Sequence, residues 1–222
     1  MFAEIAPRYD FLNHLLSAGV DIYWRRRTAS RVLPLPEGPI LDVCAGTGDL
    51  SFALNRRFRG KRRIVATDFC RPMLAIGRRK ALKQRCEPIA WLEADTLQLP
   101  FPDDTFALVC VAFGLRNVAD TDAGLAEMVR TTKPGGKVAI LEFTLPRGVL
   151  GKLYAWYFHR VLPRIGQALA GNRYSAYNYL PASVSEFPQY EGLCRRMEAA
   201  GLHSAVFFPM TFGIATLYIG SK

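Results

Sequence analysis

A glycine turn separates an apolar stretch from a helical pattern within residues 40–49, and its residue types suit the binding of a nucleotide-like ligand. Gly46 and Gly48 carry no Cβ, so the backbone can turn tightly there and approach a ligand closely. Ser51 stands where a dinucleotide-binding loop has its third glycine, which argues against a dinucleotide. Because similar turns also end ordinary strands, the neighbouring residues must decide what the turn binds.

Three carboxylates follow three successive apolar runs. Asp42 precedes the glycine turn, Asp68 ends the second run, and Asp95 follows the third. A carboxylate at position 42 would repel a pyrophosphate, but it could meet the cationic methionine end of S-adenosyl-L-methionine (SAM). Asp68 could accept hydrogen bonds from both ribose hydroxyls, and Asp95 could meet the adenine amino group. The pattern therefore favours a cationic nucleoside over a phosphate-bearing one.

The elements that must position these residues alternate between strand and helix, which is typical of an α/β fold with a mostly parallel sheet. The sequence predicts strands at residues 40–44, 63–67, 89–93, 106–112, 137–143, 205–210 and 214–220, and helices at 49–58, 72–85, 123–132 and 189–200. A turn is expected at 133–136. Ligands bind beyond the carboxyl ends of such strands, where the glycine turn, Asp68 and Asp95 would meet.

Two regions lie outside this repeat within a chain of 222 residues that we expect to form one domain. Within residues 1–38, the sequence predicts two helices, at 9–16 and 22–32, which would roof the cofactor cleft. Residues 147–188 form an aromatic insertion that would act as a lid for the substrate. An amphipathic helix at 149–169 carries Lys152, Arg160 and Arg164 on one side. It either packs into the core or touches lipid headgroups.

The net charge of +10 favours an acidic partner, either nucleic acid or an anionic membrane surface. Basic residues crowd positions 24–27, 56–63 and 78–85, although solvated helix faces would account for them equally well. The five cysteines show no C-x-x-C pairing, so we expect a reducing, cytoplasmic setting and core positions for Cys44, Cys70 and Cys110. The three histidines lack ligand spacing, so no metal site is predicted. No apolar stretch reaches the roughly 18 residues of a membrane span.

Motifs along essentially the whole chain resemble those of the ubiquinone/menaquinone biosynthesis C-methyltransferases. Residues 1–10 and the Phe-Gly-Leu-Arg-Asn segment at 113–117 are specific to that family, and residues 99–106, 133–136, 141–143, 162–166, 177–180 and 211–213 continue the match. The resemblance implies a class I SAM-dependent methyltransferase (Rossmann-like) fold, with a seven-stranded, mostly parallel sheet and helices on both faces. It also implies SAM as cofactor and C-methylation of a polyprenylated quinol.

The family's cofactor contacts fall on Thr47, Asp68, Asp95, Thr96 and Ala112. Two of these positions depart from the commoner pattern, because the family often has Ala at 96 and Ser at 112. At Ala112, only the backbone can form a hydrogen bond to the cofactor.

For the chemistry, we assign Arg116 to stabilising a developing phenolate and Asn117 to orienting a hydroxyl. Tyr9 or a water would accept the proton that the quinol hydroxyl loses, and His159 is a weaker candidate for this role.

Within the family, the chain most resembles members that act on demethylmenaquinol, a polyprenyl naphthoquinol. C-methylation of a polyprenyl benzoquinol in ubiquinone biosynthesis is the alternative, and a non-catalytic SAM-binding regulator or assembly subunit is an alternative of another class. Motifs of nucleic-acid methyltransferases are missing, so we expect no nucleic-acid partner. We expect a cytoplasmic protein, compatible with a homodimer, that meets the anionic inner face of the cell membrane transiently.

Overall fold

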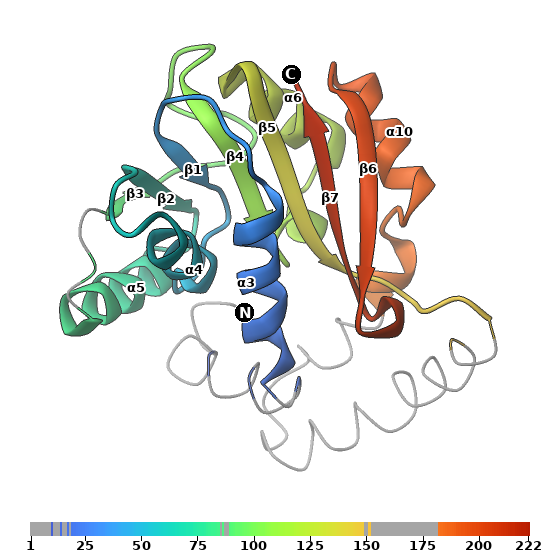
Figure 1. Ribbon diagram of the computed structural model, residues 1–222, viewed down its shortest axis with the longest axis horizontal. Coiled ribbons are helices and arrows are strands. Elements are labelled where there is room, and N and C mark those ends of the chain that lie inside the picture. The colour runs from blue at the N-terminus through green and yellow to red at the C-terminus, as the bar shows by residue number, and fades with distance from the viewer. Residues whose placement is uncertain are drawn as a thin grey trace.

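The computed structural model describes residues 10, 14, 17, 19–84, 86, 89–148, 151 and 182–222. Seven strands form one sheet in the order β3-β2-β1-β4-β5-β7-β6 (Figure 1). The first five strands pair in parallel, whereas β7 runs antiparallel to both β5 and β6. The strands are β1 (Ile40–Asp42), β2 (Ile64–Asp68), β3 (Ile89–Glu93), β4 (Phe106–Ala112), β5 (Thr132–Phe143), β6 (His203–Met210) and β7 (Ala215–Ser221). The predicted mostly parallel, seven-stranded sheet is confirmed.

Helices cover both faces of this sheet. They are α3 (Val20–Arg31), α4 (Asp49–Phe58), α5 (Arg71–Gln84), α6 (Thr121–Thr131) and α10 (Glu191–Ala199), with short 3-10 turns η2 (Leu115–Asn117) and η4 (Thr211–Gly213). On one face, α3 and α4 bury Trp24 and Leu54 against Leu108 of β4. On the other, α6 and α10 bury Met128 and Met197. With both faces covered, the central strands are continuous apolar runs rather than alternating ones.

One predicted boundary is wrong. β5 begins at Thr132, and the expected turn at 133–136 is instead a bulge within this strand, between the pairs Phe106–Thr132 and Leu108–Lys137. Gly135 takes a φ of 73°, which favours glycine. The Gly135 amide donates to the carbonyl of Lys222 at 2.8 Å, and the Lys222 amide donates to Gly136 at 3.0 Å. The chain's last residue thus pairs with the bulge.

The other predicted helices and strands in the described part of the chain start and end within two residues of the observed ones. The predicted helices at 9–16 and 149–169 lie, apart from residues 10, 14 and 151, outside the described residues. Within the described part of the chain, no helix combines the length and apolar character that a membrane span requires.

Candidate functional site

A cavity of about 320 Å³ lies at the carboxyl ends of β1, β2, β3 and β4. The loops after these strands line it, as expected for a sheet of this kind. Six of the residues proposed from the sequence belong to the described lining: Gly46, Asp68, Asp95, Thr96, Ala112 and Asn117. The described lining does not include Asp42, Thr47, Gly48 or Arg116, and Tyr9 lies outside the described residues.

The glycine turn needs its two glycines for different reasons. Gly48, with a φ of 87°, precedes α4, and a Cβ there would lie 2.3 Å from the Cη2 atom of Trp91. Gly46, with a φ of 57°, has no atom within 4 Å of the place where a Cβ would lie. Gly48 is therefore required for packing against the Trp91 ring, whereas Gly46 keeps the cavity open.

Asp68 is held by two backbone amides at the end of β2. Its Oδ2 accepts a hydrogen bond from the Gly46 amide, and its Oδ1 accepts one from the Cys70 amide, each at 2.7 Å. Burial raises the pKa of this carboxyl, and the two amide bonds offset part of that effect. Each carboxylate oxygen can accept more than one hydrogen bond, so both oxygens can still accept from a ligand.

The loops after β3 and β4 complete the cavity. Asp95 is exposed, and its Oδ1 accepts from the Leu97 amide at 2.9 Å, while the buried Thr96 hydroxyl lies 3.3 Å from Cys44 Sγ. Gly114 follows β4, and a Cβ at this position would lie only 2.4 Å from the Cβ of Cys44. The absence of a side chain at Gly114 therefore lets the β4 loop pack directly on the glycine turn.

Asp42 lies behind the glycine turn rather than on the cavity surface. Its side chain is fully buried, and Ser51 Oγ of α4 donates a hydrogen bond to its Oδ2 at 2.5 Å. Burial raises the pKa of Asp42 to about 7, although the Ser51 hydroxyl and the charge of Arg25 act in the opposite direction. A carboxylate in this place can act on a bound cation only through the electric field.

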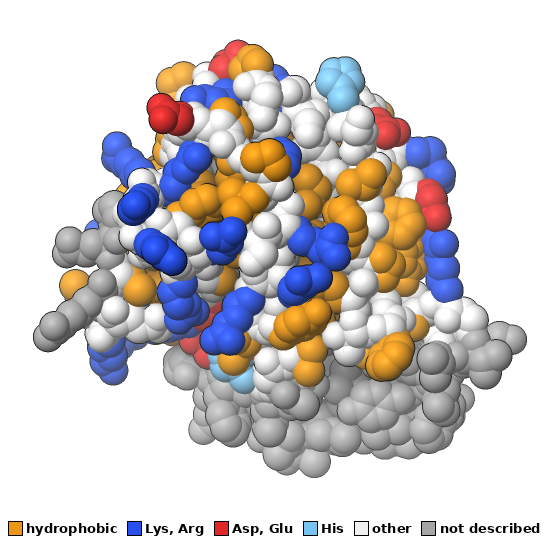
Figure 2. Space-filling model, in the orientation of Figure 1, with side chains coloured by type: hydrophobic (Ala, Val, Ile, Leu, Met, Phe, Trp, Pro, Cys, Tyr) orange, Lys and Arg blue, Asp and Glu red, His pale blue; other side chains and the backbone are white. Residues whose placement is uncertain are grey.

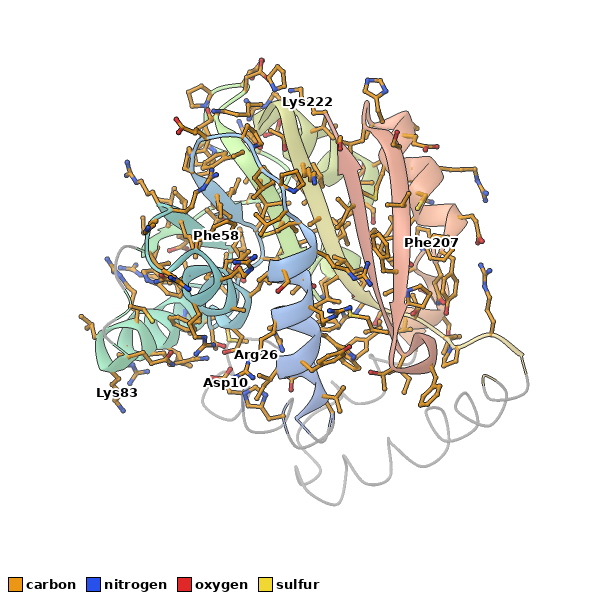
Figure 3. The ribbon with its side chains drawn as sticks, viewed as in Figure 1. Asp10, Arg26, Phe58, Lys83, Phe207 and Lys222 are labelled. Carbon is orange, nitrogen blue, oxygen red and sulfur yellow. The ribbon has the colours of Figure 1, made fainter. Side chains whose placement is uncertain are left out.

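A polar network clamps the glycine turn from outside. Thr47 Oγ1 donates to Asp10 at 2.5 Å and accepts from Lys80 Nζ at 3.2 Å. Lys80, on α5, also pairs with Asp10 at 2.7 Å and with Asp49 at 2.6 Å. Asp10 lies at the end of the sheet where α4 begins (Figure 3). Thr47 thus ties the turn to the N-terminal segment and to α5.

The same network extends to the start of α3. His14 Nδ1 lies 2.9 Å from Asp21, His14 Nε2 lies 3.9 Å from Asp49, and Arg25 pairs with Asp21. Ligating atoms of the histidine and the two aspartates lie within 4.8 Å of one another, as a metal site would require. However, Asp21 already pairs with Arg25 and Asp49 with Lys80, so the cluster is built as an ion-pair network.

Arg116 and Asn117, both in η2, occupy different environments. Arg116 Nη1 donates to Glu142 Oε2 at 2.7 Å and to the Phe113 carbonyl at 2.6 Å, and the side chain of Glu142 is fully buried. The Arg116 Nε is buried and has no hydrogen-bond partner among the described residues. Asn117 lines the cavity. Arg116 is therefore a cation fixed by Glu142 and the Phe113 carbonyl, with a buried Nε–H that donates to no described residue.

An aromatic group stands beside this cation. The Phe113 and Phe143 ring centroids are 4.4 Å apart, and Trp24 packs against both rings. The Arg116 guanidinium lies 5.5 Å from the Phe143 centroid. Phe113 also lines the cavity, so this part of the wall is aromatic.

Several lining residues were missed from the sequence. Phe69 is 76% exposed and lines the cavity, and its place directly after Asp68 could have indicated it. Cys110 is buried as predicted. Cys44 and Cys70 are only partly buried and line the cavity, although Cys44 also packs against the core. No local signal distinguishes Lys80 from the other cations of its basic cluster, because its partners are distant in sequence.

The sheet order, the glycine turn after β1 and the acidic residue that ends β2 define the class I fold of SAM-dependent methyltransferases. A SAM-dependent methyltransferase from Thermotoga maritima superposes with a TM-score of 0.70 at 18% identity, over 100% of this chain and 98% of that one. Phosphoethanolamine N-methyltransferase 2 from Haemonchus contortus, in complex with SAM, superposes with a TM-score of 0.67 at 14% identity, over 100% of this chain and 60% of that one. The chain belongs to the ubiE/COQ5 methyltransferase family, whose model matches residues 1–222.

Relatives within this family align over the full chain. The demethylmenaquinone methyltransferase of Thermus thermophilus is 48% identical over 100% of both chains, and that of Deinococcus radiodurans is 46% identical over 100% of this chain and 91% of its own. The ubiquinone/menaquinone biosynthesis C-methyltransferase UbiE of Geobacter sulfurreducens is 46% identical over 100% of this chain and 87% of its own. The expected family, the class I fold, methyltransferase activity and SAM as cofactor are confirmed.

Proposed function

We propose that the protein transfers the methyl group of SAM to a ring carbon of demethylmenaquinol, a polyprenyl naphthoquinol, in menaquinone biosynthesis. The observation that carries this proposal is the full-length, 48% identity with a demethylmenaquinone methyltransferase. The cavity agrees with it, because an aromatic wall lies next to carboxylates and a fixed cation. Binding sites for small molecules usually combine an apolar lining with a few placed polar groups.

The residues at the cavity fit SAM. Gly46 leaves space at the glycine turn, and Asp68 keeps acceptor capacity on both oxygens for the two ribose hydroxyls. Asp95 is exposed at the rim, where it could accept from the adenine amino group, with Thr96 and the Ala112 backbone beside it. SAM, when bound, supplies an electrophilic methyl group on a sulfonium.

The remaining three cofactor positions support the site indirectly. Gly48 allows the turn to pack on Trp91, and Thr47 anchors the turn to Asp10 and Lys80. Asp42 would favour the positive sulfonium through its field, although no atom of it is exposed. We therefore keep all three in the cofactor site, with Gly48 and Thr47 acting on the shape of the turn.

The protein's task toward the quinol is to make a ring carbon nucleophilic in a dry site. A quinol carbon gains electron density when the neighbouring hydroxyl gives up or shares its proton. Arg116 is permanently charged, and we assign its guanidinium to stabilising the negative charge that develops on a quinol oxygen. Asn117 would orient a hydroxyl from the cavity wall, and Tyr9 or a water would accept the proton.

The test is product formation from two reduced substrates. Purified protein is incubated with SAM and either demethylmenaquinol or a demethylated benzoquinol analogue, and the products are identified by mass spectrometry. We expect methylated naphthoquinol. Methylation of the benzoquinol alone would instead support the ubiquinone alternative. SAM binding by calorimetry without turnover of either quinol would support the non-catalytic regulator.

We also propose a cytoplasmic protein that meets its substrate at the anionic inner face of the cell membrane, without nucleic acid as partner and compatible with a homodimer. A polyprenyl tail stays in the bilayer, so the enzyme must work at its surface. The cations Lys152, Arg160 and Arg164 that the sequence suggests for this contact lie outside the described residues. The described residues offer another candidate surface.

A further inference from the structure

Helix α3 exposes a single stripe to solvent. Ile22, Tyr23, Arg26, Arg27, Ser30 and Arg31 recur at helical spacing, and all of them are exposed. The residues between them, such as Trp24 and Ala29, are buried against the sheet. Three of the six exposed residues are arginines and none is acidic, because the helix's one acidic residue, Asp21, is buried and paired with Arg25.

Helix α4 packs beside α3 and continues the positive charge. Arg56 and Arg57 in its last turn are exposed. Within the described part of the chain, none of Arg26, Arg27, Arg56 and Arg57 takes part in an ion pair. Figure 2 shows Lys and Arg side chains gathered over α3 and α4 on the face toward the viewer. Their charge is therefore available to a partner.

The opposite face of the sheet differs. There α6 and α10 carry acidic residues among their cations, and ion pairs form: Arg130 with Glu127 and Asp103, and Arg196 with Asp122. Among the described residues, the positive charge without an ion-pair partner is thus concentrated on the side of α3 and α4, and this asymmetry favours one docking side over a uniformly basic surface.

Exposed apolar side chains lie at the end of this surface nearest the cavity. Ile22 and Tyr23, in the first turn of α3, are 39% and 50% exposed, and Phe212 in η4 is 82% exposed. Trp24 Nε1 donates to Thr211 Oγ1 at 2.8 Å, so the segment that carries Phe212 is fastened to α3. The same end of α3 contacts the network at the glycine turn through Asp21 and His14.

We infer that this surface, formed by Ile22, Tyr23, Arg26, Arg27, Arg56, Arg57 and Phe212 and here called the docking face, binds the headgroups of an anionic lipid bilayer. A basic helix side with apolar residues at its edge is the arrangement by which proteins lie on membranes. The inference rests on the proposed quinol substrate, whose tail keeps it in the bilayer. Docking in this way would place the cavity end of the sheet next to the lipid that holds the substrate.

The inference is tested by sedimentation of the full chain with phosphatidylcholine vesicles that contain increasing phosphatidylglycerol. The Arg26/Arg27→Gln variant removes two exposed cations from the docking face. Because each cation near an anionic surface is worth a several-fold change in partitioning, we expect vesicle binding to fall roughly 20-fold, with a weaker dependence on salt. Arg56/Arg57→Gln should act in the same direction, and Phe212→Asn should reduce the binding that persists at high salt.

The charge-matched control is Arg195/Arg196→Gln on α10, which removes two exposed cations from the opposite face, of which Arg196 is paired with Asp122. Its vesicle binding should stay within about 3-fold of the parent if the docking face is specific. An equal loss in the control, parent-like binding by Arg26/Arg27→Gln, or stronger binding of the parent to an RNA oligonucleotide than to the vesicles would overturn the inference.

A turnover assay separates this inference from the proposed function. Methylation of a short-tailed, water-soluble demethylated naphthoquinol requires no membrane, so Arg26/Arg27→Gln should retain parent activity there while losing vesicle binding. If the parent binds vesicles through this face but methylates no quinol, the proposed function fails and the docking face stands. If the parent methylates the quinol and the variants bind vesicles unchanged, only the docking face fails.

Discussion

Asp42 should make the protein less stable as the pH rises from about 4 to 8. In the fold, burial raises the pKa of Asp42 to about 7, whereas an unfolded aspartate titrates near 3.9. Below about pH 4 the carboxyl is protonated in both states, so it adds no pH dependence. Between these pH values the folded state holds more protons than the unfolded state, so the free energy of unfolding falls as pH rises, and it levels off above about pH 7.

The size of the effect follows from the two pKa values. A difference of about 3 units at about 1.4 kcal/mol per unit corresponds to a loss of about 4 kcal/mol across the window. Asp42→Asn keeps an oxygen that can accept from Ser51 but cannot ionise. Groups shared by both proteins, including Asp68, largely cancel in the difference between variant and parent.

The assay is urea unfolding of parent and Asp42→Asn at a series of pH values from 4 to 8. From pH 4 to 8, we expect the free energy of unfolding of Asp42→Asn to rise relative to that of the parent by up to about 4 kcal/mol. For a chain of this size, this corresponds to about 10 °C in Tm. If the two proteins differ in unfolding free energy by the same amount at every pH, the substitution has changed only the hydrogen bond with Ser51. That result would refute the conclusion that Asp42 is buried with a raised pKa.

Three further predictions concern the site. Asp68→Ala should weaken SAM binding about 30-fold or more in calorimetry, because two ribose hydroxyls would lose their acceptor; an unchanged Kd would contradict that role. Arg116→Lys keeps a cation beside Glu142 but loses the guanidinium's fork of donors, so kcat should fall about 100-fold with little change in SAM affinity, and a defect confined to SAM affinity would move Arg116 to the cofactor side. Gly48→Ala should lower the free energy of unfolding by about 2 to 4 kcal/mol, because the new Cβ would meet the Trp91 ring. Gly135→Ala has a similar φ but open space around the Cβ, so it should lower it by only about 1 kcal/mol. Equal losses in denaturant unfolding would show that backbone strain alone matters.

The sequence by itself determined the elements and the end of the sheet where the site lies. Strand and helix periodicities are local, and the carboxyl ends of parallel strands meet at one edge, so the glycine turn, Asp68 and Asp95 could be brought together without coordinates. The structure places Gly46, Asp68 and Asp95 at one cavity. The pattern predicted an α/β fold with a mostly parallel sheet, and the resemblance to the family's motifs implied the class I fold.

Tertiary structure alone decided what each side chain at that edge contacts. Asp42 follows an apolar run as Asp68 does, yet packing of α4 buries it beneath the turn and gives it Ser51 as partner. Arg116 meets Glu142 on β5, 26 positions away, and Lys80 meets Asp10 across 70 positions. Such contacts depend on how distant segments pack, and no local periodicity records them. The charge of the chain was evident from its composition, but the gathering of Lys and Arg side chains over α3 and α4 required the folded arrangement of these helices.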